Sequence, residues 1–377
     1  MDAATMTTIA RGELVSLAQA KAGVPNALSP LHLFALPSGT SPAAAPAKSS
    51  VPVPADLLVR LSRPDWTVTI RMGGGDWPIQ ELVLCGQSDG GAVTGIRPSG
   101  TMDASLFGWA SPEAFSAWWC GQFAHRGEED VPNPIPPSCS LEAFLMMLQA
   151  VDAYRRALML ATLAHRPSTD LRMTAADFNA ACRSSIAARD IRWLAAAFML
   201  LVPGLGAYKL AGGAESLKPA YDRDFLATFA DGEKGAQQLG FGQVGQMVGL
   251  EFARGWQMAA GYESRTAAPE GIRAVARGFV APTALTNHFV RLEPLADGRA
   301  NANHQTMGFT EMNAALTGVL REAVQAARMP AGAHATGTAN ASLPGSPAAG
   351  GDRFCHQCGT KLDAGASFCL QCGTRQE

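Results

Sequence analysis

One pattern, Phe-Cys-x-x-Cys-Gly-Thr, occurs twice near the end of the sequence, at residues 354–360 and 368–374. It places four cysteines in the spacing Cys-x2-Cys-x10-Cys-x2-Cys: Cys355, Cys358, Cys369 and Cys372. Each Cys-x-x-Cys can wrap one side of a tetrahedral ion, and two such turns complete a four-thiolate site. Because so short a segment has almost no core, we expect metal binding to supply its folding energy. The pattern predicts one structural Zn2+ held by all four cysteines.

The residues around the cysteines fit the same interpretation. Gly359 and Gly373 follow the second cysteine of each pair, where a knuckle turn needs a positive φ. The stretch over about residues 353–375 resembles the small zinc-ribbon family, and four thiolates leave no open position for a catalytic water. Two alternatives stay open: a pair of disulfides, which needs an oxidising compartment, and a redox Cys-x-x-Cys, which normally occurs singly at a helix start.

Charge argues for a protein partner. The chain has 377 residues, 47% of them apolar and 16% charged, with a net charge of -2. Within the zinc-ribbon segment the basic and acidic residues balance: Arg353, Lys361 and Arg375 against Asp352, Asp363 and Glu377. A zinc ion with four thiolates adds a further net negative charge, so the segment offers no attractive surface for phosphates. We therefore expect another protein as partner and see no strong nucleic-acid signal.

Compartment signals favour a cytoplasmic protein. The N-terminus has neither a basic start nor an apolar run, so no secretory signal is predicted. The longest apolar run, Trp193 to Val202, is far shorter than the roughly 20 residues of a membrane span. The other cysteines have no paired spacing and are expected to be reduced and mostly packed: Cys85, Cys120, Cys139 and Cys182.

We expect an α+β fold for residues 1–140. Alternating apolar and polar residues at 66–72, followed by two more apolar runs between glycine-rich turns, predict an antiparallel β-meander over 65–97. Ser111-Pro112 is typical of a helix start, with Ser as the N-cap and Pro in the first turn. Residues 37–56 are rich in Pro, Ala and Ser and are expected to form a loop or tether.

Residues 141–328 are expected to be a helical segment that ends in a strand–strand–helix unit. Its predicted helices run over 141–165, from a capping box at Thr174 and Asp177 to about 186, over 191–202 after an Asp190 cap, and near 215–230 and 244–262. Strands at 289–292 and 304–309 and a helix over 310–328 follow. Because this order repeats that of residues 79–123, we expect a possible quasi-repeat of two α/β halves with a helical insert between them.

A change in composition separates the end of the chain from the rest. Residues 329–352 are almost all small or polar, with many Gly, Ala, Pro and Ser. They are predicted to be a flexible linker, because nothing in them can offset the entropy of ordering. Residues 353–377 follow as the zinc ribbon.

Few stretches outside the zinc ribbon suggest chemistry. Gly240 to Gly245 spells Gly-x-Gly-x-x-Gly, but residues 233–238 do not resemble the strand that a dinucleotide site needs, so no cofactor site is predicted. His288 and His304 could face each other across the last hairpin and, with Glu311, form a site assembled from distant residues. Ordinary surface or core histidines are the alternative. Trp118 and Trp119 would anchor a partner if exposed, and core packing is the alternative.

A second resemblance concerns the rest of the chain. It rests on Gly12-Glu13-Leu14-Val15 through Pro25 and on residues 57–68, Leu-Leu-Val-Arg-Leu-Ser-Arg-Pro-Asp-Trp-Thr-Val, with the meander and helix behind them. These stretches resemble the EspG family, the cytosolic chaperones of type VII secretion, over residues 10–125 and 270–328. The resemblance implies a quasi-twofold pair of α/β halves that binds an export substrate in bacterial secretion.

Taken together, the sequence predicts a non-enzymatic adaptor or chaperone-like protein with no catalytic residues. The alternatives are an enzyme with a site assembled from dispersed residues and a nucleic-acid-binding protein that uses the zinc ribbon.

Overall fold

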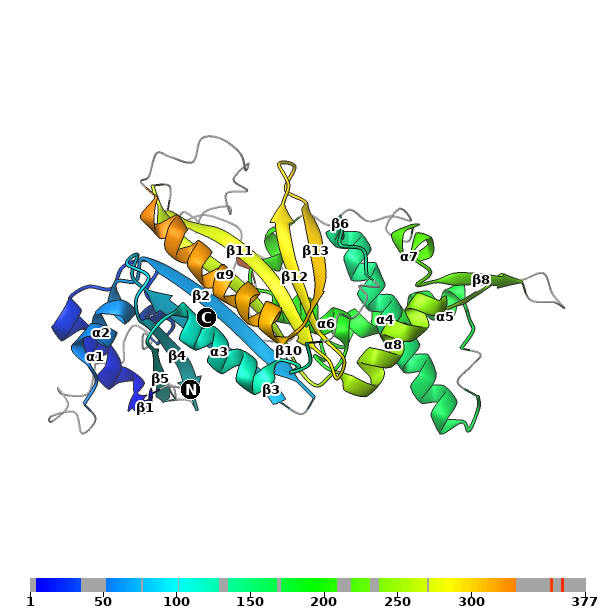
Figure 1. Cartoon of the computed structure of the whole chain (residues 1–377), viewed down its shortest axis with the longest axis horizontal. Coiled ribbons are helices and arrows are strands. Elements are labelled where there is room, and N and C mark those ends of the chain that lie inside the picture. Colours follow the sequence, from blue (N-terminus) through cyan, green and yellow to red (C-terminus); the bar gives the residue numbers. More distant parts are fainter. Residues whose placement is uncertain are drawn as a thin grey trace. The chain divides into compact units, whose positions relative to one another are not determined.

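A computed structural model describes residues 5–34, 52–75, 77–100, 102–128, 135–167, 171–208, 218–230, 237–269, 271–329, 353–354 and 361–362. The chain divides into two compact units, Met1–Ala339 and Asn340–Glu377, which we call the body and the tail. The body is α+β, as expected, with antiparallel strands and helices (Figure 1). The predicted linker falls on residues that lie almost wholly outside the described ones.

The body is built on one ten-stranded antiparallel sheet in the order β1-β5-β4-β3-β2-β10-β11-β12-β13-β6. Its strands are β1 (Thr5–Ala10), β2 (Trp66–Gly74), β3 (Trp77–Gly86), β4 (Val93–Ser99), β5 (Asp103–Trp109), β6 (Ser138–Ser140), β10 (Ala259–Ala268), β11 (Gly271–Pro282), β12 (Asn287–Pro294) and β13 (Ala300–Met307). Strands from distant parts of the chain meet at its centre, where β2 pairs with β10. The two meanders, β2–β5 and β10–β13, thus form one continuous sheet.

The first meander has one more strand than the sequence predicted. The predicted strands match β2, β3 and β4, and β5 extends the meander beyond residue 97. In β5, residues Ala104 to Phe107 are all buried, because helices cover both faces of the sheet there. A strand buried on both faces loses the alternation that reveals a half-exposed one, which explains why β5 was missed.

The second meander was only half predicted. Strands β12 and β13 correspond to the expected strands, but β10 and β11 fall where no strand was expected. The helix predicted over 244–262 is wrong in its second half: α8 (Gln243–Gly255) ends, and β10 begins at Ala259. The charged residues Glu263 and Arg265 within β10 conceal its strand character.

Two helices cover one face of the sheet. Helix α3 (Pro112–Phe123) follows the first meander and α9 (Phe309–Arg328) follows the second, and they pack side by side (Figure 1). Beneath them lies a core to which both meanders contribute large apolar side chains, such as Trp66 and Met72 from β2 and Tyr262 from β10.

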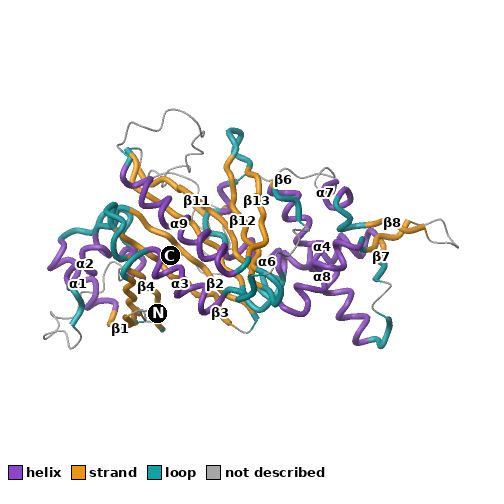
Figure 2. Tube along the Cα trace, in the orientation of Figure 1, coloured by secondary structure: helices purple, strands orange, loops and turns teal. Residues whose placement is uncertain are grey.

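Different layers cover the two halves of the opposite face. A small core with Leu58 and Leu61 joins the first half to α1 (Arg11–Ala22), α2 (Ala55–Ser62) and the short helix η1 (Pro30–Phe34). A larger helical insert covers the second half: α4 (Leu141–Leu163), α5 (Ala175–Ala187), α6 (Leu194–Leu201), η2 (Leu205–Ala207), α7 (Lys218–Asp222) and α8. A three-stranded sheet, β7 (Met173–Thr174), β9 (Gln237–Gly240) and β8 (Ala227–Ala230), completes the insert. Figure 2 shows α4, α7 and α8 at the end of the body opposite α1 and α2.

Two of the three helix caps predicted from the sequence are found in the structure. The Ser111 side chain accepts from Ala114 N, and Thr174 Oγ1 accepts from Asp177 N at 3.1 Å, so both predicted caps are confirmed. The cap predicted for Asp190 is wrong, because α6 begins later, at Leu194. Its first N–H groups donate to Asp152 of α4, at 2.8 Å from Leu194 N and 2.9 Å from Ala195 N. A side chain from another helix therefore takes the capping role.

Membrane insertion of the helices finds no support in the described part of the chain. None of its helices combines the length and the apolar character that a bilayer crossing requires.

Candidate functional site

The tail holds a short hairpin around the first cysteine pair. Strand β14 (Arg353–Phe354) pairs antiparallel with β15 (Lys361–Leu362), with Arg353 opposite Leu362 and Phe354 opposite Lys361. This pairing brings together the two ends of the segment 355–360, which carries Cys355, Cys358 and Gly359. The four cysteines themselves lie outside the described residues.

The body contains a buried chain of hydrogen-bonded polar groups. His288 Nδ1 lies 3.0 Å from His304 Nε2, and His288 Nε2 lies 2.9 Å from Glu251 Oε1. The hydroxyl of Thr283 donates to the same Glu251 oxygen at 2.5 Å. The chain therefore connects α8, the turn after β11, and strands β12 and β13. Because an ionised carboxylate only accepts, His288 Nε2 donates to Glu251, and one hydrogen is shared between the two imidazoles.

Burial and neighbours set the protonation of this chain. Burial and the adjacent His288 hold the pKa of His304 well below its usual 6.5. Burial alone would raise the pKa of Glu251, but the hydrogen bonds and charge of His288, with the Thr283 hydroxyl, lower it below its usual value. The group therefore keeps an ionised glutamate and an uncharged His304 inside an apolar core near neutral pH.

The structure brings together two of the three residues that were predicted to form a dispersed site. His288 and His304 meet as expected, but Glu311 is exposed on α9 and Glu251 takes the carboxylate position. His288 is 2% exposed and His304 1% exposed, so a substrate cannot reach either ring in this conformation. Glu251 was missed, although one signal was present: it follows Val248 on the core-facing side of α8, where a glutamate is unusual.

The Gly240-to-Gly245 stretch does lie between a strand and a helix, which corrects the sequence interpretation. Strand β9 ends at Gly240 and α8 begins at Gln243. The helix start is already occupied by the chain itself, since Gln243 N donates to Asp224 Oδ2 at 2.7 Å. A Cβ added at Gly242 would lie 2.0 Å from Asp224 Oδ1, and one added at Gly245 would lie 2.1 Å from Phe225 O. These two glycines therefore allow the 224–225 segment to approach where a phosphate would lie in a dinucleotide site.

A second buried charged cluster lies where the insert meets the centre of the sheet. Glu263 of β10 is fully buried and accepts from Arg265 Nε and Arg277 Nε, both at 2.7 Å. The Arg277 guanidinium also lies over the ring of Tyr208, 5.2 Å from its centroid. A Cβ at Gly204 would lie 2.8 Å from both Glu263 Oε1 and Arg277 Nε, so the turn before η2 packs directly on this cluster. Through Gly204 and Tyr208, the insert therefore contacts buried charged groups of the sheet.

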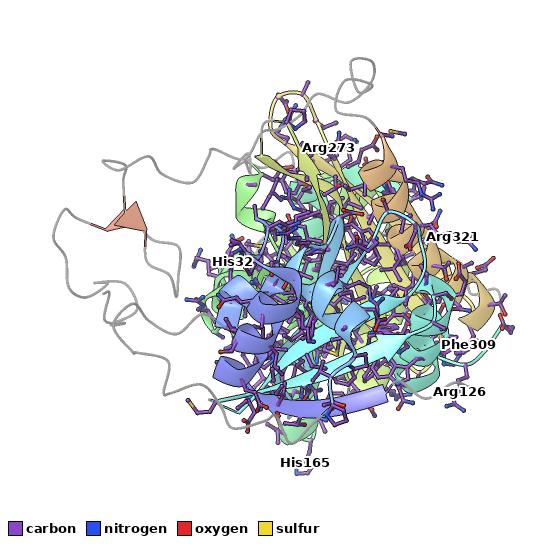
Figure 3. All side chains as sticks on the ribbon, turned by 90° about the vertical axis from the view of Figure 1, so that its left-hand side faces the viewer. His32, Arg126, His165, Arg273, Phe309 and Arg321 are labelled. Carbon is purple, nitrogen blue, oxygen red and sulfur yellow. The ribbon has the colours of Figure 1, made fainter. Side chains whose placement is uncertain are left out.

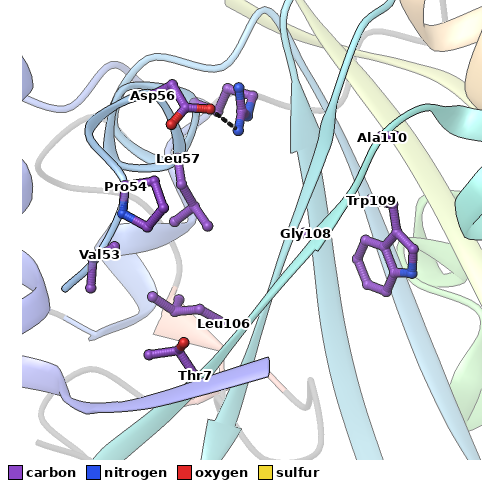
Figure 4. Close-up of a pocket in the computed structure, with 10 residues that line it drawn as sticks. Thr7, Val53, Pro54, Asp56, Leu57, Leu106, Gly108, Trp109 and Ala110 are labelled. Carbon is purple, nitrogen blue, oxygen red and sulfur yellow. Dashed lines mark hydrogen bonds and ion pairs between the residues drawn. The ribbon is translucent and has the colours of Figure 1, made fainter. Parts of the chain in front are cut away.

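A pocket of about 280 Å³ lies between α2 and β5 (Figure 4). Ten residues line it: Thr7, Val53, Pro54, Asp56, Leu57, Arg60, Leu106, Gly108, Trp109 and Ala110. A Cβ at Gly108 would meet nothing within 4 Å, so this glycine leaves space on the strand. The charge is internally balanced, because Arg60 is paired with Asp56 at 2.7 Å. The pocket can therefore hold a small apolar group, and none of the residues predicted to be functional lines it.

The tryptophans chiefly build core. Trp119 is 1% exposed, and Trp118 is partly buried against Trp109 with ring centroids 5.3 Å apart. Core packing, rather than an exposed anchor pair, is therefore the correct interpretation for these two residues. The exposed tryptophan is Trp77, 52% exposed and edge-on to Phe123. Figure 3 shows other side chains that reach the surface: His32, Arg126, His165, Arg273 and Arg321.

No cluster of metal-binding side chains is found among the residues that the structure describes. Comparison with protein families places a zinc-ribbon domain at residues 354–376, which confirms the predicted resemblance of the tail. No curated protein matches the chain. The resemblance of the body to the EspG family therefore stays a prediction.

Proposed function

We propose that this chain is a non-enzymatic, cytoplasmic protein-interaction protein of the adaptor or chaperone type that carries a structural zinc ribbon. The zinc-ribbon match at residues 354–376 carries the proposal. A four-thiolate zinc site is structural and not catalytic, and metal binding supplies the folding energy of so small a module. Among the described residues, the hydrogen-bonded pair His288 and His304 is buried and closed to a substrate, which supports the proposal further.

Cys355, Cys358, Cys369 and Cys372 would hold the metal. The hairpin that closes residues 355–360 fits this arrangement, since it returns the chain on itself across the first cysteine pair. A zinc ion with four thiolates has no open position, so its contribution is folding energy and not reactivity. Residues 329–352 would join the zinc ribbon to the body as a flexible linker.

The order of elements in the body supports two related halves. Each half has a helical layer, then a four-stranded meander, then one helix, and the halves meet at the antiparallel pair β2 and β10. A quasi-twofold body of this kind, with a large insert in its second half, offers two unlike surfaces for partners. The predicted division into residues 1–140 and 141–328 would follow the boundary before the insert.

Metal analysis tests the zinc centre. Purified protein should hold about one zinc per chain, and replacing Cys355 and Cys369 with Ser should release it. Replacing Cys85 and Cys182, which are buried in the body, provides the matched control and should leave the zinc content unchanged. A well-folded, metal-free tail would contradict the assignment.

Affinity capture tests the interaction role. Full-length protein and a chain ending at Met329 should be used to capture partners from the native cell, and partners lost from the shorter chain would be assigned to residues beyond it. An enzyme remains the second candidate because His288 and His304 lie within hydrogen-bonding distance. A turnover that is abolished by His288→Gln, in protein whose fold and partners are unchanged, would favour that candidate.

A further inference from the structure

The last turns of α4 carry large apolar side chains on the solvent-exposed side of the helix. The first part of α4 is largely buried in the insert, from Leu141 to Tyr154. Beyond it, Met159 is 58% exposed, Leu160 52% and Leu163 72%. Single exposed apolar residues are ordinary, but three large ones within two turns form a contiguous patch.

Helical geometry places these three residues on one face. At 100° per residue, positions 156, 159, 160 and 163 share one side of the helix. The opposite side is the one that packs inward, since Ala161 is 2% exposed and Leu158 packs against the core of the insert. The apolar patch therefore faces away from the body. His165 lies two residues after the end of α4 and reaches the edge of the body in Figure 3.

Along the chain, the charged residues next to the patch are cationic. Residues 153–169 contain three arginines and a histidine and neither Asp nor Glu, in a chain with a net charge of -2. Arg155 is tied to Asp152, but Arg156 lies on the patch face and Arg166 just beyond the helix, both exposed. A patch with apolar residues at its centre and cations at its edges complements an apolar seam flanked by carboxylates.

We propose that the patch formed by Met159, Leu160 and Leu163 docks an acidic amphipathic helix of a partner protein. The patch is two helical turns long, which matches the i, i+3, i+4 seam by which helices pack on each other, and Arg156 and Arg166 pair with acidic residues beside that seam. This inference rests on the proposed interaction function and names the surface and the partner's chemistry. The methionine suits such a seam because its side chain adapts to different neighbours.

Site-specific crosslinking in the native cell locates the partner segment. A photo-crosslinking amino acid is placed at Leu160 of the full chain, with Leu33, 60% exposed in the first half, as the matched control position. Peptides crosslinked at 160 and not at 33 are sequenced. The expected product is a segment with helical apolar spacing and net negative charge. A basic or neutral segment, a second copy of this chain, or no protein crosslink at 160 overturns the proposal.

Binding measurements with the sequenced segment then test the contact itself. The segment is made as a synthetic peptide, and its Kd for the full chain is measured at low salt. The double variant Leu160→Ser with Leu163→Ser should raise the Kd by at least about tenfold, because both lost residues are anchors. Arg156→Glu should raise the Kd by a similar factor, and exchanging an acidic residue of the peptide for Lys should restore it. An Arg156→Glu effect that no exchange restores overturns the proposal.

Two controls separate the possible failures. Flotation with vesicles of phosphatidylcholine and phosphatidylserine should show no binding that depends on Leu160 and Leu163; binding that does would assign the patch to a membrane surface instead. Circular dichroism should be unchanged in every variant, because Leu160, Leu163 and Arg156 are all exposed. If partners are captured elsewhere on the chain while position 160 stays silent, the proposed function stands and this inference fails.

Discussion

The two halves of the ten-stranded sheet have the same strand order but close their cores differently. Among the described residues before 129, the buried polar side chains are all hydroxyls: Ser29, Ser62, Thr67, Thr94, Ser105 and Ser116. The described residues of the second half and its insert bury six acidic, basic or histidine side chains: Asp152, Glu251, Glu263, Arg277, His288 and His304. The small layer of α1 and α2 rests on apolar contacts and on hydrogen bonds such as Arg60 Nε to Thr94 Oγ1 at 2.8 Å, whereas the large insert also packs on buried charged groups. Burial of apolar area is non-directional and favours contact between layers, whereas a buried charge pair is favourable only in one geometry and so favours one position of the layers.

The largest expected effect comes from Glu263. Glu263→Ala should cost about 3–5 kcal/mol, because it leaves Arg277 buried and unpaired where the insert meets the sheet. Urea unfolding measures the change. Glu81→Ala is the matched control, since the Arg71–Glu81 pair lies in the first meander and is 39% and 29% exposed. That variant should change stability by less than about 1 kcal/mol. Equal losses of unfolding free energy in the two variants would contradict the inferred difference between the cores of the two halves.

A smaller loss is expected at Asp152. Asp152→Ala removes the acceptor for Leu194 N, Ala195 N and the Ser185 hydroxyl, and should cost about 2–3 kcal/mol. Hydrogen exchange should show faster exchange of the Leu194 and Ala195 amides. As control, Ser111→Ala removes the local cap of α3 and should cost about 1 kcal/mol. If Asp152→Ala costs no more than Ser111→Ala, the cap from α4 does not hold the insert.

Acid should weaken the second half through His304. The folded-state pKa of His304 is depressed, so the unfolded chain binds a proton below about pH 6.5 that the folded chain does not. Stability is therefore full above that pH and falls by up to about 1.4 kcal/mol for each pH unit below it. The lowered pKa of Glu251 adds a further loss below about pH 4.5. The measurement is the urea midpoint at pH 7 and 5.5.

Two variants test that assignment. His304→Gln keeps a donor toward His288 and should remove most of this pH dependence. His165→Gln, at the exposed end of α4, should leave it unchanged. A pH dependence that survives in His304→Gln would assign it to another group.

Removal of residues 330–377 is expected to have the smallest effect. The last residue of α9 is Arg328, which donates to the carbonyls of Ser88 and Asp89 between β3 and β4. A chain ending at Met329 should thus unfold within about 0.5 kcal/mol of the full chain, whereas Arg328→Ala should cost about 1 kcal/mol. A large loss from the truncation would show that the body depends on residues beyond 329.

Local signals let the sequence predict helix starts, and long-range contacts explain the failures. Ser111 and Thr174 cap helices within three residues, so the signal and its effect lie in one short window. The cap of α6 comes from Asp152, 42 residues before Leu194, and no local pattern reveals it. Strand β10 is similar along one edge, because its partner β2 lies far away in sequence.

The histidine pair shows both cases in one site. Val290 lies opposite His304 in the β12–β13 register, so His288 is its diagonal neighbour on the same face, and a predicted hairpin was enough to bring the two together. Glu251 belongs to a helix of the insert, and only the packing of that helix places it there. The zinc-ribbon pattern was the easiest to recognise, because its signal is covalent spacing that needs no tertiary context.

The pairing of β2 with β10 has a consequence for synthesis of the chain. Until β10 leaves the ribosome, β2 has an open edge whose main-chain groups can pair with other chains. At about 5–20 residues per second, the chain between Gly74 and Ala259 takes roughly 10–40 s to make. The first meander therefore keeps an unpaired edge at β2 until β10 has been synthesised. The nascent chain should be more prone to aggregate than the finished protein, and more dependent on chaperones that act at the ribosome.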